Sequence, residues 1–416
     1  MKKIFKVTFM TGILTFIRMF VGFIIAKVVA IYTGPAGMAM LGQVQSVVSA
    51  LTGIASAPVG SGLIRYTAEY QTKGYEACSI WWRSCVLWVL WILAIIVPIG
   101  LFFSKNISLF VFKTEEYSFL LIILTLLLPL SAVGTLVASV INAQQNYRKY
   151  FLLGIISTLV SSIIMVIMII NYNLAGALFA CAVQTSVIGL IMLIGVCKEP
   201  WIKWQYWWGG VKKEQMMAIG GYILMAITSA ICTPLSLILV RNILVSNVGW
   251  DIAGQWQAVW KISEVYLGVI TIALGTYYLP RLSSMTGVIN IREEINQTSK
   301  IIVPLLIILA VFVYLLRDIA LSLLFTSKFG PARDLFSVQL IGDVIKIISW
   351  LYAYPMISRG ATRWYVATEI FFSLTFVLFT LCFVKFYGVH GANFSYAINY
   401  CIYFIFVYMN LDRISK

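Results

Sequence analysis

Twelve long apolar segments follow one another along this chain. Each is about 20 residues or longer, the length that an α-helix needs to cross the hydrocarbon core of a membrane. Only short polar or turn-forming stretches separate them, so little chain is left for a domain outside the membrane. The segments, numbered as spans 1 to 12, cover residues 8–32, 38–62, 80–102, 118–141, 151–170, 174–197, 215–245, 252–280, 300–321, 332–357, 364–386 and 392–411.

The composition is also typical of a membrane protein. Of its 416 residues, 61% are hydrophobic and only 11% are charged, whereas soluble domains carry about 25% charged residues. This deficit excludes an ordinary cytosolic enzyme, and it excludes a disordered chain, which needs few apolar and many charged residues. We expect an all-α polytopic membrane protein with about 12 transmembrane helices, an even number that puts both termini on one side.

The basic residues predict which side that is, because Lys and Arg gather in the cytoplasmic loops of membrane proteins. If the N-terminus is cytoplasmic, 19 of the 30 Lys and Arg residues fall in the tails and cytoplasmic loops. Seven, Arg241 among them, fall on or near the outer side. We therefore predict a multi-pass protein with both termini in the cytoplasm. Most of the basic residues behind the net charge of +15 then serve to orient the protein in the membrane. We therefore expect no nucleic-acid partner.

The sequence carries no motif of a soluble enzyme. It has no Gly-x₄-Gly-Lys-[Ser/Thr] loop for nucleotide phosphates. Its single histidine, His390, cannot build a His-based metal site, and its seven cysteines show no metal-binding spacing. We interpret the cysteines as small buried apolar residues. The chain is therefore predicted to be no enzyme, with neither a metal nor a cofactor.

The two halves of the chain repeat short motifs at almost one spacing. Gly-Gln-Val-Gln at 42–45 returns as Gly-Gln-Trp-Gln at 254–257, and Tyr-x₃-Gly-Ala-x-Phe occurs at 172–179 and again at 387–394. Each motif falls at a corresponding place in spans 1–6 and in spans 7–12. Because six is an even number, both halves have the same orientation in the membrane. We expect two lobes related by an axis along the membrane normal, with the substrate path between them.

The repeat sets the predicted domain boundaries. The connection between the halves is rich in Trp and Lys, and Trp201, Trp204 and Trp208 would share one face of a helix. We predict that it is amphipathic and lies in the cytoplasmic membrane interface. A cluster that stacks on a ligand is the alternative. The predicted parts are an N-terminal six-helix lobe, the cytoplasmic linker and a C-terminal six-helix lobe, at residues 1–198, 199–214 and 215–416.

Spans 1, 2, 7 and 8 each present one polar face at helical spacing, and the repeat makes them positional equivalents. In span 2 the face includes Gln45. Small and hydroxyl residues at this spacing also let helices pack closely, which is the alternative interpretation. We predict that the four spans line one cavity. The face of span 1 is built from Thr8, Thr11, Thr15, Arg18 and Gly22.

Seven ionisable residues lie inside predicted spans and away from their ends, where each unpaired charge costs about 3 kcal/mol on insertion scales. The first half contributes two cations and no acid, and the second half contributes two cations and three acids. Lys261 with Glu264, and Asp343 with Lys346, are three residues apart and are expected to neutralise each other. The seven are Arg18, Lys27, Lys261, Glu264, Asp343, Lys346 and Glu369.

This asymmetry predicts an anion site near the first lobe, with Arg18 as its best candidate. The alternative for Lys27 is that it extends toward the outer interface, because it lies about half a helical turn out of phase with Arg18. For the two charged pairs, the alternative is a packed polar contact without a role in transport. The predicted cavity residues are Arg18, Lys27, Gln45, Lys261 and Lys346, and the predicted coupling or gating residues are Glu264, Asp343 and Glu369.

Several stretches of the chain resemble Wzx-type flippases, which move undecaprenyl-pyrophosphate-linked oligosaccharides in O-antigen and enterobacterial common antigen synthesis. These proteins belong to the multidrug/oligosaccharidyl-lipid/polysaccharide export superfamily. The resemblance runs over the full length, although at Glu264 we expect an Asp from the family. It is densest at residues 34–37, 250–257, 262–264, 279–282, 315–318, 328–336 and 339–346.

The resemblance implies two six-helix lobes around a cationic cavity, lined by helices 1, 2, 7 and 8, that opens alternately to the two sides of the bacterial inner membrane. The cargo would be an undecaprenyl-pyrophosphate-linked oligosaccharide whose polyprenyl tail stays in the lipid bilayer. A proton or sodium gradient would drive its movement from the cytoplasmic to the periplasmic leaflet. The implied protein partners are polysaccharide polymerase and chain-length proteins.

Three alternatives stay open at this point. A drug/cation antiporter of the same superfamily, or another polysaccharide exporter, has the same pattern of spans, but a cationic cargo predicts acids in the first lobe in place of Arg18 and Lys27. A membrane polymerase or ligase predicts large outer loops with catalytic Arg or His, and the outer loops here are short. A scaffold without transport leaves the polar faces without a purpose.

Overall fold

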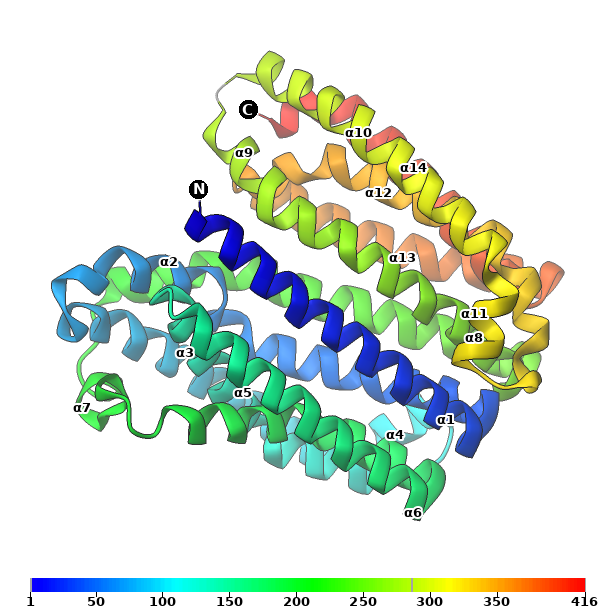
Figure 1. The fold of residues 1–416 in the computed structure, drawn as a ribbon, viewed down its shortest axis with the longest axis horizontal. Helices are drawn as coiled ribbons and strands as arrows, with labels where there is room; N and C mark the ends of the chain where they lie inside the picture. The colour runs from blue at the N-terminus through cyan, green and yellow to red at the C-terminus, as the bar shows by residue number, and fades with distance from the viewer. Residues whose placement is uncertain (1, 286, 416) are drawn as a thin grey trace. The chain divides into compact units, whose positions relative to one another are not determined.

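The computed structural model describes residues 2–285 and 287–415, leaves the side chains of residues 2–11, 61 and 222 undescribed, and is helical in all its regular structure (Figure 1). The helices are α1 (Lys2–Ser56), α2 (Ser61–Tyr70), α3 (Tyr75–Phe102), α4 (Ser104–Phe112), α5 (Ser118–Ala143), α6 (Tyr147–Val196), α7 (Trp204–Trp207), α8 (Lys213–Ala273), α9 (Leu279–Ser284), α10 (Val288–Leu315), α11 (Arg317–Leu324), α12 (Phe336–Ser358), α13 (Thr362–Tyr387) and α14 (His390–Ile414). Shorter helical turns are η1 (Ala57–Val59), η2 (Gln71–Lys73), η3 (Pro200–Ile202), η4 (Leu274–Tyr278) and η5 (Ser327–Leu335).

Nine of the described helical stretches are long and apolar enough to cross a membrane. Three of these helices, α1, α6 and α8, contain 55, 50 and 61 residues, far more than the roughly 20 needed for one crossing. Each is interrupted by one residue with non-helical backbone angles: Gly34, Asn173 and Gly249 respectively. These residues lie in the gaps that separate spans 1 and 2, 5 and 6, and 7 and 8. The nine stretches therefore carry the twelve predicted spans, and the predicted fold class is confirmed.

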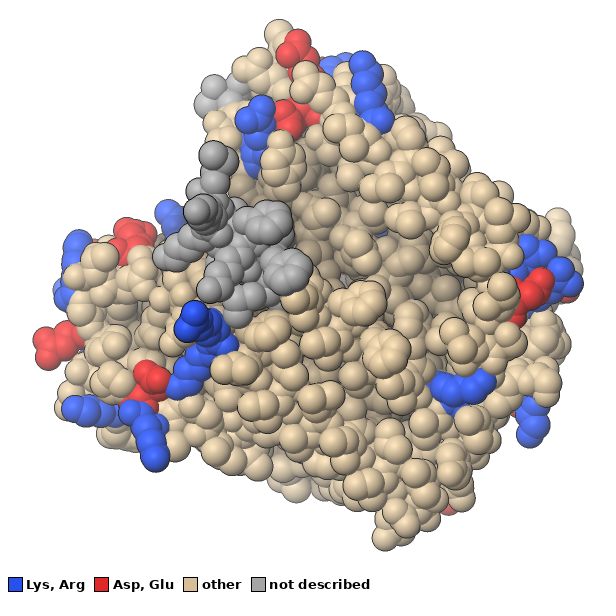
Figure 2. Space-filling model, in the orientation of Figure 1, with Lys and Arg blue, Asp and Glu red and all other residues tan. Residues whose placement is uncertain are grey.

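The distribution of charge on the surface is that of a multi-pass membrane protein. On the face drawn in Figure 2, the Lys, Arg, Asp and Glu side chains lie near the ends of the helices, and the long stretches between them are uncharged. Large apolar side chains such as Phe16, Trp91 and Ile308 are more than 60% exposed along these stretches. Such exposure is unfavourable in water and favourable in lipid.

The backbone makes the same turns in both halves of the chain. Eight positions with positive φ form four pairs whose members are 213 or 215 residues apart, close to the offset of the repeated sequence motifs. A residue with positive φ typically ends one helix and lets the next one begin. The two halves therefore share the same order of helices. The pairs are Gly34 and Gly249, Gly74 and Gly287, Gln145 and Gly360, and Asn173 and Gly388.

The helices form two compact units. Unit 1 consists of Met1–Tyr32 and Gln43–Pro234, and unit 2 consists of Thr33–Gly42 and Leu235–Lys416. Unit 2 thus includes the turn at Gly34 and the start of span 2, while unit 1 includes the first half of span 7. The lobes of residues 1–198 and 215–416 stay a prediction, because they were defined by the repeat and not by packing.

Trp82 lies at the centre of the core of unit 1 and is fully buried. Its indole N–H donates a hydrogen bond of 2.9 Å to Thr67 Oγ1, and its ring stacks on that of Trp207 with 4.8 Å between centroids. Trp201 packs edge-on against the same ring and is 1% exposed. Two tryptophans of the predicted linker therefore belong to the core of unit 1.

The predicted single amphipathic face of the linker is wrong. The extended backbone of Lys203, with ψ at 134°, separates η3 from the one-turn helix α7 and breaks the helical phase. Trp201 consequently turns into the core, whereas Trp204 and Trp208 are 73% and 55% exposed and stack on each other at 5.6 Å. An exposed Trp pair of this kind is typical of the membrane interface. The interfacial role predicted for the linker then rests on Trp204 and Trp208 alone.

Two glycines allow the segment Thr33–Gly42 to pack tightly against the second half of α8 within unit 2. A Cβ atom at Gly254 would lie 1.9 Å from the carbonyl oxygen of Pro35, and one at Gly42 would lie 2.6 Å from Gln257 Cδ. Both glycines begin the repeated Gly-Gln-x-Gln motif. The motif therefore starts with glycine because the two helices approach more closely there than a side chain permits.

Replacing Gly254 with alanine is expected to lower the thermal unfolding temperature of the protein. Because the atom in contact is a backbone oxygen, the helices must separate, and overpacking of this kind costs about 1–3 kcal/mol. Gly268→Ala, on the same helix, is the matched control, since nothing lies within 4 Å of its Cβ position. Equal unfolding temperatures of the two purified variants in detergent would contradict the tight contact.

Candidate functional site

The candidate site is a group of charged, hydroxyl and aromatic side chains inside unit 2. It is assembled from the second half of α8 and from α12, α13 and α14. The fold brings together residues that are up to 140 positions apart in the sequence, Trp260 and Tyr400. Five of the eight predicted site residues meet here, namely Lys261, Glu264, Asp343, Lys346 and Glu369.

Asp343 lies at the centre of this group and is fully buried. Its Oδ2 atom accepts hydrogen bonds from Ser263 Oγ at 2.6 Å and from Tyr266 OH at 2.7 Å, both on α8. Its Oδ1 atom accepts from Tyr396 OH of α14 at 2.9 Å and from Gln339 Nε2 at 3.2 Å. Four donors thus converge on one carboxylate, which accepts hydrogen bonds on both oxygens when ionised. The carboxylate links three helices through a polar contact.

Lys346 lies one turn further along α12 inside a ring of four aromatic side chains. Its Nζ atom is 5.0 Å from the ring centre of Trp350, 5.5 Å from Tyr400, 5.6 Å from Tyr396 and 5.7 Å from Trp260. An ammonium within about 6 Å of a ring face is attracted to it by about 0.5–2 kcal/mol. The aromatic rings therefore stabilise a positive charge at this depth in the unit.

Asp343 and Lys346 do not form the direct ion pair that their spacing permits, although their charges still attract each other. Among the described residues, no carboxylate oxygen lies within 4.0 Å of Lys346 Nζ. The carboxylate of Asp343 is taken up by hydroxyl groups of α8 and α14, while the longer side chain of Lys346 reaches the aromatic rings. Spacing along α12 permits the pair, but packing against the neighbouring helices supplies other partners for both groups.

The second predicted pair is present. Lys261 Nζ lies 3.2 Å from Glu264 Oε2, and the indole N–H of Trp260 donates to Glu264 Oε1 at 3.1 Å. The side chain of Glu264 is 46% exposed and opens into a cavity of about 190 Å³. Glu264 is therefore accessible from the cavity, whereas Asp343 is fully buried. The cavity is lined by Trp260, Ser263, Glu264, Leu267, Gly268, Thr271, Gln339, Lys346, Trp350 and Tyr396.

Glu369 of α13 is the third acid of the group. It is half-buried and interacts electrostatically with Lys346 and with Tyr400. Lys346 thus interacts electrostatically with three acids, Asp343, Glu264 and Glu369, without a direct ion pair to any of them. This arrangement explains how one lysine is held in a largely apolar unit.

Arg241 is a member of the site region that the sequence reasoning missed. The pattern of basic residues predicts that it lies on or near the outer side of the membrane, but the structure buries it inside α8, where it is 2% exposed. Its Nε atom donates a 2.7 Å hydrogen bond to Gln257 Oε1, which belongs to the repeated Gly-Gln-x-Gln motif. The neighbouring polar residue Asn242, inside the same apolar run, is the signal that could have shown a buried polar contact. With Arg241 included, the site region of unit 2 contains three cations, Arg241, Lys261 and Lys346, and the three acids named above.

The first glutamine of the repeated motif has a structural role in each half. Gln43 Nε2 donates to the carbonyl oxygen of Val111 at 3.1 Å in unit 1. Gln255 Nε2 donates to that of Lys328 at 2.8 Å in unit 2. Each bond ties its span to the chain near the end of a short helix, α4 or α11. The motif therefore has one structural glutamine, followed two residues later by Gln45 or Gln257.

The remaining predicted site residues belong to unit 1. Arg18 is exposed on α1 and lies beside Gly154 of α6, where a Cβ atom would be 3.6 Å from its Nη2. It makes no hydrogen bond or ion pair with a described residue. Lys27 and Gln45 are half-buried. The side chains of Thr8 and Thr11, which begin the predicted polar face of span 1, lie outside the described residues.

Sequence comparison with protein families decides where the chain belongs. The family described as "Polysaccharide biosynthesis protein" matches residues 4–286, about two thirds of the chain. The chain belongs to this family. This polysaccharide biosynthesis protein is also similar to a protein named lipid III flippase from Escherichia coli K12, with 26% identity over 407 residues that cover 96% of each chain.

Solved structures agree with the family through their fold. This polysaccharide biosynthesis protein aligns with a multidrug resistance MATE family transporter of the MOP superfamily in its inward-facing conformation, with a TM-score of 0.79, 14% identity and 95% of each chain covered. It also aligns with a MOP superfamily transporter from Pyrococcus furiosus, whose binding pocket is described as having reverse polarity, with a TM-score of 0.67, 14% identity and 99% and 96% coverage. At this identity the likeness shows the fold, which is that of MOP superfamily transporters.

Proposed function

We propose that this protein is a flippase that moves an undecaprenyl-pyrophosphate-linked oligosaccharide from the cytoplasmic to the periplasmic leaflet of the bacterial inner membrane. The observation that carries the proposal is the distribution of charge. Away from their ends, the spans of unit 1 contain the cations Arg18 and Lys27 and no acid, and Arg18 is exposed without a partner among the described residues. An uncompensated cation within the membrane favours an anionic cargo. The full-length similarity to a protein named lipid III flippase supports the same cargo.

The residues of unit 1 then bind the polar head of the cargo. The guanidinium of Arg18 is suited to a pyrophosphate because it offers two parallel N–H donors to phosphate oxygens. Lys27 adds charge, and Gln45 offers an amide to sugar hydroxyl groups. The polyprenyl tail stays in lipid. Alternating access between two six-helix lobes, residues 1–198 and 215–416, moves the head across the membrane without carrying the tail through protein.

The acids of unit 2 couple this movement to a gradient of protons or sodium ions. Glu264 receives the ion because its carboxylate opens into the cavity. Asp343 responds to it, since its four hydrogen bonds connect α8, α12 and α14. Lys261, Lys346 and Glu369 set the local field. Neutralising one acid changes the balance of three cations and three acids, which alters how the helices attract one another.

Glu264→Gln is expected to leave the protein folded while removing the dependence of transport on the ion gradient. Glutamine keeps the size and an acceptor for Trp260, but it carries no charge and binds no proton. Asp251→Asn, an exposed acid on the same helix, is the matched control. Transport of a labelled lipid-linked oligosaccharide is measured in proteoliposomes with and without a gradient. Unchanged gradient dependence in Glu264→Gln would remove this residue from the coupling group.

The function itself is tested by deleting the gene and analysing the lipid-linked intermediates of the strain. A flippase predicts that one undecaprenyl-pyrophosphate oligosaccharide accumulates on the cytoplasmic side and that the wild-type chain restores its use. The same strain shows which polymerase and chain-length proteins act downstream as partners. A strain that accumulates no such lipid but becomes sensitive to cationic drugs would instead favour the antiporter alternative.

A further inference from the structure

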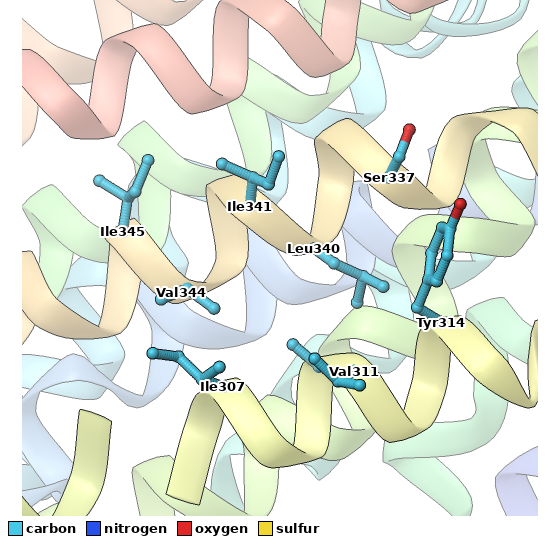
Figure 3. Close-up of a pocket in the computed structure, with 9 residues that line it drawn as sticks. Ile307, Val311, Tyr314, Ser337, Leu340, Ile341, Val344 and Ile345 are labelled. Carbon is cyan, nitrogen blue, oxygen red and sulfur yellow. The ribbon is translucent and has the colours of Figure 1, made fainter. Parts of the chain in front are cut away.

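An apolar groove of about 400 Å³ runs between α10 and α12 of unit 2 (Figure 3). Its only side-chain hydroxyls belong to Tyr314 and Ser337, which lie together at one end of it. Ile307, Val344 and Ile345 lie at the opposite end (Figure 3). The full lining is Ile307, Ala310, Val311, Tyr314, Ser337, Leu340, Ile341, Val344 and Ile345.

The groove faces the outside of the unit along two candidate membrane spans. Val311 and Ile341 on its rims are 51% and 58% exposed, and Leu340 at its floor is 5% exposed. The volume equals that of roughly a dozen water molecules, but two hydroxyl groups cannot provide the two to four polar partners that each ordered water needs. Hydrocarbon therefore fills the groove in a membrane.

Helix α12 separates this groove from the polar site. Gln339 and Lys346 project toward the cavity that contains Glu264, whereas Ile341 and Val344 project into the groove. The same helix is polar on one face and apolar on the other. The groove is therefore a second surface feature of unit 2, independent of the ion-coupling residues.

A cation lies at the hydroxyl end of the groove. The guanidinium of Arg317 is 4.0 Å from the ring centre of Tyr314, and its Nη1 donates to the Tyr314 carbonyl oxygen at 2.6 Å. The adjacent acid Asp318 is not its counter-ion, because it pairs with Arg333 at 2.9 Å. Among the described residues, no acid lies within ion-pair distance of Arg317. Arg317 also lies in the connection between two candidate spans, and such connections pass through the headgroup region of a membrane.

We propose that the groove binds one hydrocarbon chain of an anionic phospholipid whose phosphate contacts Arg317. Hydrocarbon gains little by leaving the bilayer for an equally apolar groove, because lipid tails are as apolar as the lining side chains. The shape of the groove therefore admits the chain, and the charge of Arg317 retains it. This places a phospholipid between α10 and α12, where it fills a gap that protein side chains leave open.

The test uses the full-length protein in nanodiscs with phosphatidylglycerol that carries a diazirine on one acyl chain. After illumination, the label is expected on peptides of α10 and α12 that line the groove. Arg317→Gln is expected to reduce this labelling about fivefold, equivalent to ~1 kcal/mol for one basic group near a lipid surface. Arg317→Lys should retain most of it, and Lys105→Gln, an exposed cation in unit 1, should retain all of it.

A second pair of variants tests the groove itself. Val311→Trp fills the groove and should abolish labelling, whereas Ile308→Trp, at another exposed position on α10 outside the lining, should not. Equal labelling by a phosphatidylcholine probe, or full labelling of Arg317→Gln or Val311→Trp, would overturn the proposal. Displacement of the probe by farnesyl pyrophosphate but not by unlabelled phosphatidylglycerol would also overturn it, and would assign the groove to an isoprenoid pyrophosphate.

Discussion

Replacing Arg18 with alanine is expected to abolish complementation of a flippase-null strain while the protein still reaches the membrane. Charged hydrogen bonds to a phosphate are worth about 1.5–3 kcal/mol, so the rate of transport should fall roughly 10- to 100-fold. Folding should be little affected, because Arg18 is exposed and makes no hydrogen bond or ion pair with a described residue. The measurements are growth or polysaccharide display of the strain, membrane abundance, and initial transport rates in proteoliposomes.

Two further variants separate charge from shape at this position. Arg18→Lys keeps the charge but loses the planar pair of donors, so we expect it to restore part of the rate. Lys105→Ala removes an exposed cation of unit 1 outside the polar faces and should transport as wild type does. Wild-type complementation by Arg18→Ala would remove this residue from the cargo site, although the protein could still be a flippase that binds the head elsewhere.

Replacing Asp343 with alanine is expected to destabilise unit 2 and to stop transport. The substitution leaves Ser263, Tyr266, Gln339 and Tyr396 with donors that face an empty space in a fully buried position. Losing a buried charged partner of this kind costs about 3–5 kcal/mol. The change should appear as a lower unfolding temperature of the purified protein in detergent and as reduced membrane abundance.

The conservative variant distinguishes structure from coupling at this carboxylate. Asp343→Asn keeps the volume and one acceptor oxygen, and hydroxyl groups can rotate to accept from the new amide. We therefore expect it to recover much of the unfolding temperature without recovering gradient-driven transport. Asp251→Ala, an exposed acid of α8, should change neither property. An unfolding temperature of Asp343→Ala equal to that of the wild type would contradict the four-donor network.

The membrane spans could be predicted from the sequence because a membrane imposes one strict requirement on every segment that crosses it. Each crossing needs about 20 apolar residues with all backbone hydrogen bonds made internally. The three breaks inside α1, α6 and α8 fall in gaps that were marked by polar or turn-forming residues. The repeated motifs likewise predicted two similar halves, and the paired backbone turns of the two halves agree with that prediction.

The side chains that contact the buried charges could not be predicted from the sequence in this way. Asp343 and Lys346 have the spacing of an ion pair, but the structure gives the carboxylate to hydroxyl groups and the ammonium to aromatic rings. Most of those partners lie on α8 and α14, which are distant in sequence from α12. Arg241 was misplaced for a related reason: a charge near the end of an apolar run suits a loop equally well until its partner Gln257 is known.

Features that depend on one segment of the chain could therefore be predicted from the sequence, whereas contacts between distant helices could not. Hydropathy, turn residues and basic loops act over one span at a time, so the residue order alone specifies an all-helical membrane protein with two similar halves and cations in the first of them. The four donors on Asp343, the aromatic ring around Lys346 and the groove beside Arg317 each need side chains from two or more helices. Such contacts arise only when helices far apart along the chain pack together, because each helix can offer several faces and packing selects one.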